Sequence, residues 1–506
     1  MTDLNPDVLI VGAGPTGLTL ALWLARLGLK PRIVDKAAGP GETSRALAVQ
    51  ARTLEFHAQI GIVDDVLAAG HRIERLSLRT PEGLITALDL GSFGAGLSPY
   101  PFAFALPQDI HERVLLHHVT AAGVQVEYGT ELVEFSDDGS GITATLAKDG
   151  QQERVRASWL AGCDGAHSKV RHGLGIGFPG GAYDQSFYVA DVEGKGDITS
   201  NGMDVVLGSY GFALMLPVRQ LGSVRLIGVV PKEHEADPHI TFDTIKPQIE
   251  QASGVRISAV NWFSTYRVHH RVADRFRVGR AFLAGDAGHI HSPAGGQGMN
   301  TGMGDAVNLA WKLAAVVQGR AHPTLLDSYE PERIAFARLL IATTDRAFRL
   351  LTSRAKLLGL WRRYVMPHLM ARLLHTRWGA RLFFGVISQI RITYRGSALS
   401  AGTVGKLSGG DRLPYVADAD NFAPLRALDW QIHVHGDAHP AFAAALAETG
   451  IPLHRFAWTP AAAKAGFTRD AAYLVRPDGH ITVASAQQDI AMFGAFLDRL
   501  RIVPRG

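Results

Sequence analysis

A short apolar segment near the start of the chain runs directly into a glycine-rich loop and then into a helix-forming segment. Residues 8–11 (Val-Leu-Ile-Val) are continuously apolar, as in a strand that is buried on both faces of a parallel sheet. Gly12, Gly14 and Gly17 follow, and residues 18–27 have the composition of an apolar helix. A strand, a glycine turn and a helix in this order predict a βαβ unit whose helix N-terminus binds a dinucleotide pyrophosphate.

Each glycine of this loop has a separate expected role. Gly12 permits the tight turn, Gly14 lets the backbone approach the pyrophosphate, and Gly17 lets the helix pack closely on the strand. Asp35 lies at the end of the second expected strand, residues 30–34, where a carboxylate can accept hydrogen bonds from ribose hydroxyls. The competing interpretation is a tight turn without a ligand, which this context disfavours.

A second match to the same glycine pattern lies at Gly175, Gly177 and Gly180. It does not follow a buried strand, and Pro179 stands where a helix would have to begin. We therefore expect a loop there, and the chain has one dedicated dinucleotide site.

Two more glycine–aspartate segments lie farther along the chain. Residues 162–171 read Gly-Cys-Asp-Gly-Ala-His-Ser-Lys-Val-Arg, and residues 281–289 are an apolar stretch that ends in Gly-Asp-Ala-Gly-His. Residues 292–300 follow the latter and are rich in glycine. Taken alone, Asp164-Gly165 would be a turn with a helix cap.

Taken together, the three segments resemble the class A FAD-dependent aromatic hydroxylases, which are single-component flavoprotein monooxygenases of the phenol and polyketide hydroxylase type. The resemblance covers residues 5 to about 400. It implies non-covalent FAD, with NADPH or NADH as a transient co-substrate. It also implies that O2 is used to hydroxylate a phenolic or related aromatic ring through a flavin C4a-hydroperoxide.

The resemblance further implies roles for individual residues. Asp286 would accept hydrogen bonds from the ribityl chain, and Asp164 would order backbone N–H groups. The N–H groups of Met299 and Asn300, at the start of a helix expected from Gly302, would face the flavin N1 edge, where a helix N-terminus stabilises negative charge. The residues expected to contact the cofactor are Gly12, Gly14, Pro15, Thr16, Gly17, Asp35, Lys36, Arg45, Gln108, Leu132, Asp164, Gly165, Asp286, Pro293, Gly296, Gly298, Met299 and Asn300.

The substrate site is less well defined by the sequence. A group that deprotonates or hydrogen-bonds a phenol would speed oxygen transfer. Weak candidates are Tyr210, Arg219, His269 and His270, although residues of these types are more often ordinary core or surface residues. The expected pocket wall comprises Phe102, Phe104, Phe212, Met215, Pro293, Ala294 and Gly295.

The expected fold class is α/β, with a Rossmann-like FAD-binding domain of the glutathione-reductase type. An inserted, mostly antiparallel β domain would bind the substrate, because short alternating segments dominate from about residue 187 to 266. Residues 473–480 resemble the thioredoxin-like C-terminal domain of many family members. The expected boundaries are 1–75, 102–182 and 268–400 for the FAD-binding domain, 76–101 and 183–267 for the substrate domain, and 401–506 for the thioredoxin-like domain.

Three local features complete the expected organisation. Residues 141–146 and 153–160 alternate around Asp149-Gly150, which predicts an antiparallel hairpin. Residues 124–133 suggest one strand. Residues 402–414 are rich in glycine and turn formers, which predicts a linker.

Composition excludes several classes of protein. The 506 residues contain one cysteine, Cys163, so we expect no disulfide, no metal site, no thiol redox role for the C-terminal domain, and a cytoplasmic location. The formal net charge is +4 without a Lys/Arg run, so no nucleic-acid partner is expected, and the lack of a long uncharged stretch predicts no membrane partner. A homodimer stays open.

Two other functions stay open at this point. One is a Baeyer–Villiger or epoxidising flavin monooxygenase that acts on a polycyclic substrate. The other is a flavin-based sensor of aromatic compounds without turnover. A flavin halogenase is disfavoured, because none of the eight tryptophans forms a Trp-x-Trp motif.

Overall fold

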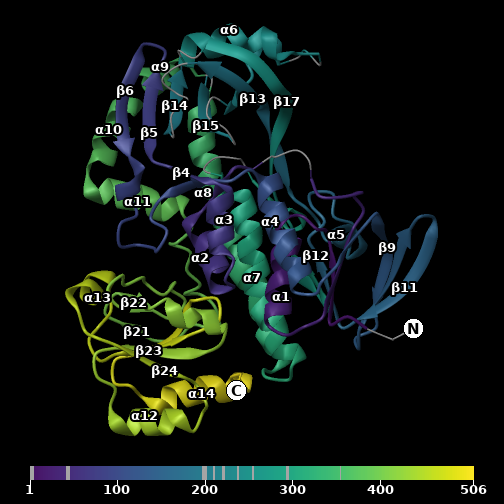
Figure 1. The fold of residues 1–506 in the computed structure, drawn as a ribbon, viewed down its shortest axis with the longest axis vertical. Coiled ribbons are helices and arrows are strands. Elements are labelled where there is room, and N and C mark those ends of the chain that lie inside the picture. The colour runs from purple at the N-terminus through teal and green to yellow at the C-terminus, as the bar shows by residue number, and fades with distance from the viewer. Residues whose placement is uncertain are drawn as a thin grey trace.

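A computed structural model defines the fold (Figure 1). It describes residues 5–41, 46–195, 202–208, 211–218, 223–235, 237, 239–253, 256–291, 296–353 and 355–505. The C-terminal part lies below the rest of the molecule in this view, and one long helix, α7 (Gly298–Val317), runs through the centre.

A six-stranded sheet forms the base of the expected nucleotide-binding unit. The first strand pairs in parallel with a neighbour on each side, as the predicted βαβ unit requires. Helix α1 (Pro15–Arg26) follows the glycine loop and packs against α7 and against α4 (Gln108–Ala121). The strand order is β18 (Arg277–Val278), β19 (Ala281–Leu283), β12 (Trp159–Gly162), β1 (Val8–Val11), β2 (Pro31–Asp35) and β8 (Val126–Tyr128).

The predicted hairpin is confirmed, whereas the single strand expected at residues 124–133 is wrong. Strands β10 (Ile142–Lys148) and β11 (Gln151–Ala157) pair antiparallel around Asp149-Gly150. Gly129 separates two strands. The first, β8, joins the six-stranded sheet, and the second, β9 (Thr130–Asp137), pairs with β10. A turn at Gly129 therefore divides this segment between two sheets.

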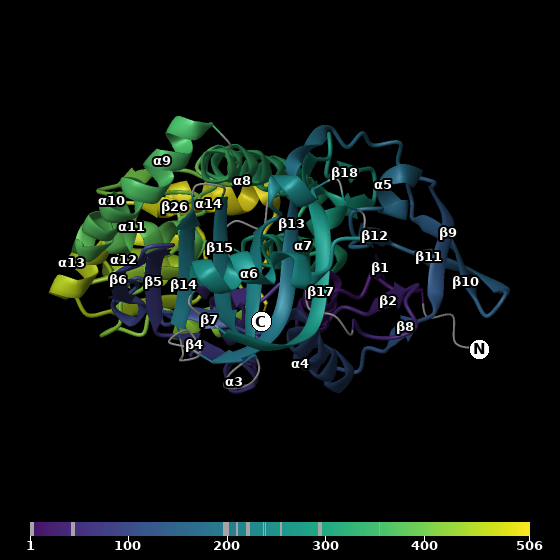
Figure 2. The same cartoon turned by 90° about the horizontal axis from the view of Figure 1, so that it is seen from above.

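A second, eight-stranded sheet holds the segments with alternating patterns (Figure 2). Helix α6 (Phe242–Ser253) covers one face, over a core that includes Ile245 and Ile249. The neighbouring strands β5 (Arg75–Thr80) and β14 (Gly202–Gly208) are parallel, and the other neighbouring pairs of this sheet are antiparallel. The order is β20 (His289–Ile290), β17 (Arg256–Val272), β13 (Gly180–Lys195), β16 (Ser223–Val229), β15 (Gly211–Pro217), β14 (Gly202–Gly208), β5 (Arg75–Thr80) and β6 (Gly83–Asp89).

The second glycine pattern, at residues 175–180, is a loop, as expected. It connects α5 (Lys169–Gly173) to β13, so a strand and not a helix follows it. The smaller elements between the two main sheets are α2 (Ala51–Gln59), α3 (Val63–Ala69), and the three short strands β3 (Ala48–Val49), β7 (Ala103–Ala105) and β4 (His71–Ile73).

Four helices follow α7 and lead to the C-terminal part. They are α8 (Tyr329–Thr352), α9 (Lys356–Tyr364), α10 (Met366–His375) and α11 (Arg377–Ile387). Helix α8 contacts β15 and β17, α9 contacts β14, and α10 contacts β5 and β6, so these helices cover part of the eight-stranded sheet.

The C-terminal part is a four-stranded sheet with helices. Strand β23 pairs in parallel with β24 and antiparallel with β25. The expected linker at residues 402–414 is wrong: β21 (Thr403–Val404) and β22 (Leu407–Ser408) form a hairpin that packs on β26. The remaining elements are β23 (Gln431–His435), α12 (Pro440–Ala447), β24 (Leu453–Phe456), α13 (Pro460–Ala465), β25 (Ala472–Val475), β26 (Ile481–Ser485) and α14 (Ile490–Leu500).

The largest apolar core joins the first and last parts of the chain. Trp311 on α7 packs edge-on against Trp430, which precedes β23, with ring centroids 5.5 Å apart. The C-terminal part is therefore packed on α7 through shared apolar residues.

Candidate functional site

The three glycine segments converge at one edge of the six-stranded sheet. They follow the carboxyl ends of β1, β12 and β19, which are neighbours and run parallel. In open α/β sheets, ligands bind in the crevice outside this edge. The sequence segments are thus brought together by strand order alone.

The first segment packs directly against the second through two glycines. Gly12 has a φ of +106°, and a Cβ there would lie 2.3 Å from the Cys163 carbonyl oxygen. A Cβ on Gly17 would lie 1.9 Å from the Gly12 carbonyl oxygen. A Cβ on Gly14, in contrast, would meet no atom within 4 Å. Gly14 therefore faces open space, as a backbone that receives a pyrophosphate must.

Thr16 connects the first segment to the third. A Cβ on Gly285 would lie 2.6 Å from Thr16 Oγ1, and a Cβ on Gly302 would lie 2.3 Å from the same atom. Two glycines on separate elements thus allow the first turn of α1 to nest between the end of β19 and α7. The close approach fixes all three segments relative to one another.

Two helices present uncapped N-termini in this region. Gly14 is the N-cap residue of α1 and Gln297 that of α7, and neither cap has a side-chain hydrogen bond among the described residues. Helix α7 begins at Gly298, four residues before the start expected at Gly302. Met299 and Asn300 therefore lie in its first turn, where backbone N–H groups stabilise a negative charge.

The Asp35 carboxylate fixes the glycine loop. Its Oδ2 accepts a hydrogen bond from Ala13 N at 2.6 Å, and its Oδ1 accepts one from Ala37 N at 2.8 Å. Lys36 is exposed, whereas Leu132 is buried in the apolar core. Contacts of these three residues with a ribose or an adenine stay predictions.

The second segment holds its own backbone and touches the third. Asp164 Oδ2 accepts a hydrogen bond from Val170 N at 3.1 Å, so this carboxylate orders backbone N–H groups. Its Oδ1 is buried without a partner among the described residues. Arg171 donates to the carbonyl oxygens of Ala166 and Ala287, both at 2.9 Å, and so bridges the second and third segments.

A buried carboxylate that the sequence analysis missed holds the third segment. Asp305, on α7, accepts hydrogen bonds through Oδ2 from Gly285 N at 2.9 Å and from His289 Nε2 at 2.7 Å. Its Oδ1 accepts one from Arg333 Nε at 2.5 Å. Burial by itself raises the pKa of Asp305, but Arg333 and His289 more than offset this and hold the pKa below its usual value.

This carboxylate positions the turn that presents Asp286, which is exposed at the end of β19. A signal for Asp305 was available in the sequence, because a charge inside a helix as apolar as residues 298–317 requires a buried partner.

The Asn300 side chain ties the start of α7 to neighbouring elements. Its Oδ1 accepts from Gln50 N at 2.8 Å, and its Nδ2 donates to the Ala48 and Gly296 carbonyl oxygens at 2.9 and 2.8 Å. Gly296 has a φ of +62°, and a Cβ there would lie 2.7 Å from Ala48 Cβ. A side chain at position 296 would therefore collide with Ala48 of the same chain.

Gln108 lies at the start of α4. It accepts from Ala46 N at 3.2 Å and donates to Glu112 Oε1 at 2.8 Å. Six of the expected site residues lie outside the described residues, namely Arg45, Tyr210, Arg219, Pro293, Ala294 and Gly295.

An aromatic cluster lies on one face of the eight-stranded sheet, opposite to α6. Tyr266 and Val268 alternate along β17 and pack with Phe187 and Phe212. The assignment of Met215 to the pocket wall is wrong, because Met215 lies in the core under α6, on the other face. Side chains alternate along a strand, so Phe212 and Met215, three residues apart, point to opposite faces.

His270 shares the face of Tyr266, while His269 is exposed on the other side. The His270 ring lies 4.9 Å from that of Tyr183, and its Nδ1 is buried without a partner among the described residues. The next residue, Arg271, pairs with Ile290 of β20, which follows the Asp286 turn closely. The strand pairing therefore places His270 beside the third segment.

Phe102 and Phe104 are both buried. Arg72 lies over the Phe102 ring, with its guanidinium carbon 4.2 Å from the ring centroid. Phe104 packs against Gly70, where an added Cβ would lie 2.5 Å from the Phe104 ring. Both residues have local packing partners, and a role in a substrate wall stays a prediction.

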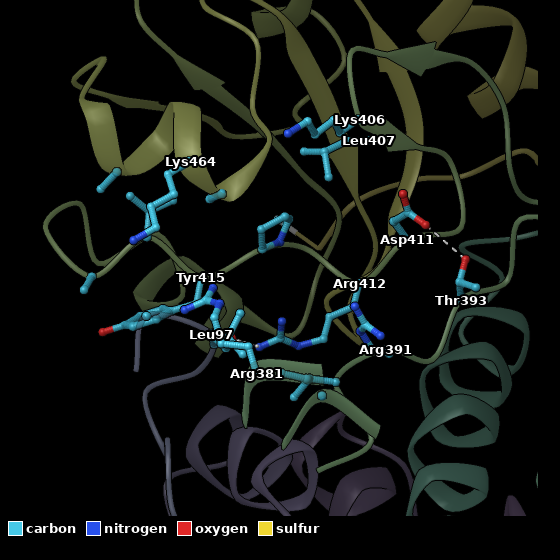
Figure 3. Close-up of a pocket in the computed structure, with 18 of the residues that line it drawn as sticks. Leu97, Arg381, Arg391, Thr393, Lys406, Leu407, Asp411, Arg412, Tyr415 and Lys464 are labelled. Carbon is cyan, nitrogen blue, oxygen red and sulfur yellow. Dashed lines mark hydrogen bonds between the residues drawn. The ribbon is translucent and has the colours of Figure 1, made fainter. Parts of the chain in front are cut away.

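A cavity of about 760 Å³ lies elsewhere, between α11 and the C-terminal part (Figure 3). Arg381, Arg391, Lys406 and Lys464 line it, together with Arg412, which is paired with Glu55 on α2. None of the expected cofactor residues lines this cavity. It is therefore separate from the site formed by the three glycine segments.

The described residues contain neither a cluster of metal-binding side chains nor a membrane-spanning helix. No group of three or more His, Cys, Asp or Glu side chains is arranged to hold a metal ion. No described helix is long and apolar enough to cross a membrane.

The similarity of the chain to known proteins agrees with the geometry of this site. Residues 5–344 match the protein family described as FAD binding domain. The chain is 39% identical over 352 residues to 6-methylpretetramide 4-monooxygenase of Streptomyces rimosus, a match that spans 69% of this chain and 63% of that protein. It is 32% identical to a flavin-dependent monooxygenase of Mycobacteroides abscessus, over 94% of this chain and 96% of the relative.

A solved structure extends the similarity to the whole fold. The anhydrotetracycline hydroxylase from Streptomyces rimosus superposes with a TM-score of 0.78 at 28% identity. The superposition covers 99% of this chain and all of that chain. The C-terminal part is thus included in the structural match.

Proposed function

Because the chain belongs to the FAD binding domain family and is an FAD-dependent monooxygenase, we propose that it hydroxylates a phenolic or related aromatic substrate with O2 and NAD(P)H. The observation that carries this proposal is the convergence of the three glycine segments at the contacts Gly12–Cys163 and Thr16–Gly285. Relatives are named for tetracycline-type and chlorinated phenol substrates, which supports an aromatic substrate here. These names do not favour Baeyer–Villiger chemistry, epoxidation or a sensor.

The residues present fit FAD. We assign the pyrophosphate to the open space at Gly14 and the uncapped N-terminus of α1. We assign the ribityl hydroxyls to Asp286, because Asp305 holds its turn at the carboxyl end of β19. Bound FAD would supply the redox chemistry, with electrons from NAD(P)H and activated oxygen for transfer. The first turn of α7 would stabilise negative charge on the reduced ring.

The aromatic cluster on β13, β15 and β17 is the proposed substrate wall. It is apolar and lies beside the Asp286 turn through the pairing of β17 with β20. An apolar wall excludes water from the reacting atoms. His270 is proposed to accept a hydrogen bond from the substrate hydroxyl, since its Nδ1 is buried and has no partner among the described residues.

The cofactor assignment is tested on the purified protein. We expect a yellow protein that releases FAD on heat denaturation, and that oxidises NAD(P)H faster when a phenolic substrate is added. Mass spectrometry should find a product heavier by one oxygen atom. A colourless protein that FAD does not reconstitute contradicts the proposal.

The role of His270 is tested by His270→Gln, with the exposed neighbour His269→Gln as the control. Loss of a group that activates the substrate hydroxyl lowers the hydroxylation rate by about 10²-fold or more. We expect this loss for His270→Gln only, with a changed pH profile of hydroxylation and unchanged FAD content. Equal rates for both variants would contradict the assignment.

The finer architecture is also a proposal. We assign residues 1–75, 102–182 and 268–400 to the FAD-binding domain, and residues 76–101 and 183–267 to the substrate domain. For 401–506 a thioredoxin-like fold is supported by the strand order β24-β23-β25-β26 with one parallel pair. The single, half-buried cysteine fits a reducing cytoplasm.

A further inference from the structure

Exposed apolar side chains are concentrated on three consecutive helices. Among the described residues, thirteen large apolar side chains are strongly exposed, and eight of them lie between residues 357 and 386. Leu357 is 81% exposed and Trp378 is 67% exposed. These eight form what we name the α9–α11 face: Leu357, Leu360, Tyr364, Val365, Leu369, Leu373, Trp378 and Val386.

The face is continuous from helix to helix. Leu357, Leu360 and Tyr364 recur at helical spacing along one side of α9, and Leu369 and Leu373 do so on α10. Helix α10 contacts both α9 and α11. Figures 1 and 2 both place the three helices side by side at the outer edge of the molecule, away from the six-stranded sheet.

The same region is strongly basic. Residues 356–387, which span the three helices, contain six Lys and Arg residues and no Asp or Glu. Lys356, Arg372 and Arg377 are exposed beside the apolar residues and have no ion pair among the described residues. Glu82, which reaches α9 from the β5–β6 turn, is paired with Arg363.

Charge decides which occupant fits this face. A two-fold contact between two copies would bring the same basic patch against itself, and this costs free energy. An anionic lipid surface instead attracts Lys and Arg, while Trp, Tyr and Leu enter the boundary between head groups and acyl chains. Such a surface needs no matching pocket, which suits side chains that project from three separate helices.

We propose that the α9–α11 face binds peripherally to the surface of an anionic lipid bilayer. The absence of acidic residues from positions 356–387 carries this signal, since the basic residues are too dispersed to form a run. The inference does not depend on the proposed substrate. It replaces the expectation of no membrane partner, which rested on the lack of a long uncharged stretch alone.

The test uses the FAD-loaded protein and sedimentation with vesicles. Vesicles of phosphatidylcholine with about 30% phosphatidylglycerol should sediment the protein, and vesicles of phosphatidylcholine alone should not. Binding should weaken when salt rises from about 0.05 to 0.5 M, because salt screens exposed charges. Trp378 fluorescence, taken as the difference from Trp378→Phe, should shift to the blue on the anionic vesicles.

Two paired variants identify the face. Leu357→Ser with Leu360→Ser, and Arg372→Glu with Arg377→Glu, should each lower the affinity for anionic vesicles about tenfold or more. Val503→Ser and Lys148→Glu, which change exposed residues elsewhere, should leave it unchanged. An unchanged flavin spectrum shows that each variant is folded.

Three outcomes would overturn the proposal. One is the absence of saturable binding to anionic vesicles by the unaltered protein. Another is a stable dimer in sedimentation velocity that the leucine pair dissociates, since the face would then be an interface between copies. Binding to an acidic protein without binding to the vesicles would equally assign the face to a protein partner and contradict a lipid one.

Discussion

Arg476 donates two hydrogen bonds to the Glu332 carboxylate, at 2.8 and 3.0 Å, across 144 residues of sequence. Both side chains are almost fully buried. Lys312 on α7 donates to the same carboxylate at 2.9 Å, and Asp478 accepts from Arg476 Nε at 2.7 Å. The turn between β25 and β26 is thus fixed to α7 and α8 by buried charges, and the C-terminal part is an integral part of the fold.

Breaking this pair should strongly destabilise the protein. Arg476→Met leaves Glu332 and Asp478 buried without their main partner, which costs about 3–5 kcal/mol in the free energy of unfolding. Arg156→Met removes an exposed partner of Asp138 and should cost at most about 1 kcal/mol. Urea unfolding of both variants measures the difference. Similar costs would show that the buried network does not hold the two parts together.

Two glycines of the loop have different roles, one in packing and one in ligand contact. Gly17→Ala should lower the thermal stability of the protein even without FAD, because its Cβ would overlap the Gly12 carbonyl oxygen. Gly14→Ala should leave that stability unchanged and weaken FAD binding, since its Cβ would enter only the open space assigned to the pyrophosphate. Melting curves without FAD and fluorescence titration with FAD give the two readouts. Full FAD affinity in Gly14→Ala would move the pyrophosphate elsewhere.

Two carboxylates at the site should differ in their effect on flavin retention. Asp286→Ala removes a charge-assisted hydrogen bond and should weaken FAD binding by about 1.5–3 kcal/mol, roughly ten- to a hundredfold. Asp35→Glu keeps a carboxylate that can still accept from Ala13 N and should change the dissociation constant less. Equal dissociation constants for the two variants would refute the assignment of Asp286 to the ribityl chain.

Gly296 provides a test of the loop that leads into α7. Gly296→Val forces a β-branched residue into a φ of +62° and against Ala48, so the loop must shift. We expect NAD(P)H oxidation to continue with more peroxide release and less hydroxylated product. The product-to-peroxide ratio measures this. Wild-type coupling in the variant would show that the loop does not shape the reacting cavity.

A buried histidine pair should make the stability depend on pH. His57 and His111 lie with their Nε2 atoms 2.9 Å apart. Burial lowers the pKa of His111 to about 3, and burial together with His111 lowers the pKa of His57 well below its usual value. In the unfolded chain both protonate near pH 6.5. The contribution of this pair to the free energy of unfolding is therefore fully present above pH 6.5, and it declines as the pH falls toward 3.

The control for this prediction lies on the same helix. His111→Gln should flatten the decline of the unfolding free energy between pH 7 and 5, whereas the exposed His117→Gln should leave the slope unchanged. Urea unfolding at several pH values measures both slopes. A slope in His111→Gln as steep as in the unaltered protein would mean that the pair protonates in the folded state.

The eight-stranded sheet shows which features the sequence predicted and which it did not. The alternating pattern predicted strands around Phe212 and Met215, and strands are present. It did not show which face meets the cofactor, because that depends on which side α6 covers. His269 and His270 were equivalent in the sequence for the same reason, and only the pairing of β17 with β13 and β20 distinguishes them.

The sequence by itself determined the parts of the site that depend on local backbone chemistry. The turn at Gly12, the close packing at Gly17 and the Asp164 cap are properties of short segments, and each segment carries its own signal. Only the tertiary structure decided which distant groups meet, as with Asp305 and Gly285, or Arg476 and Glu332. A buried charge reveals in the sequence that it needs a partner, but the identity of the partner is set by how helices and sheets pack.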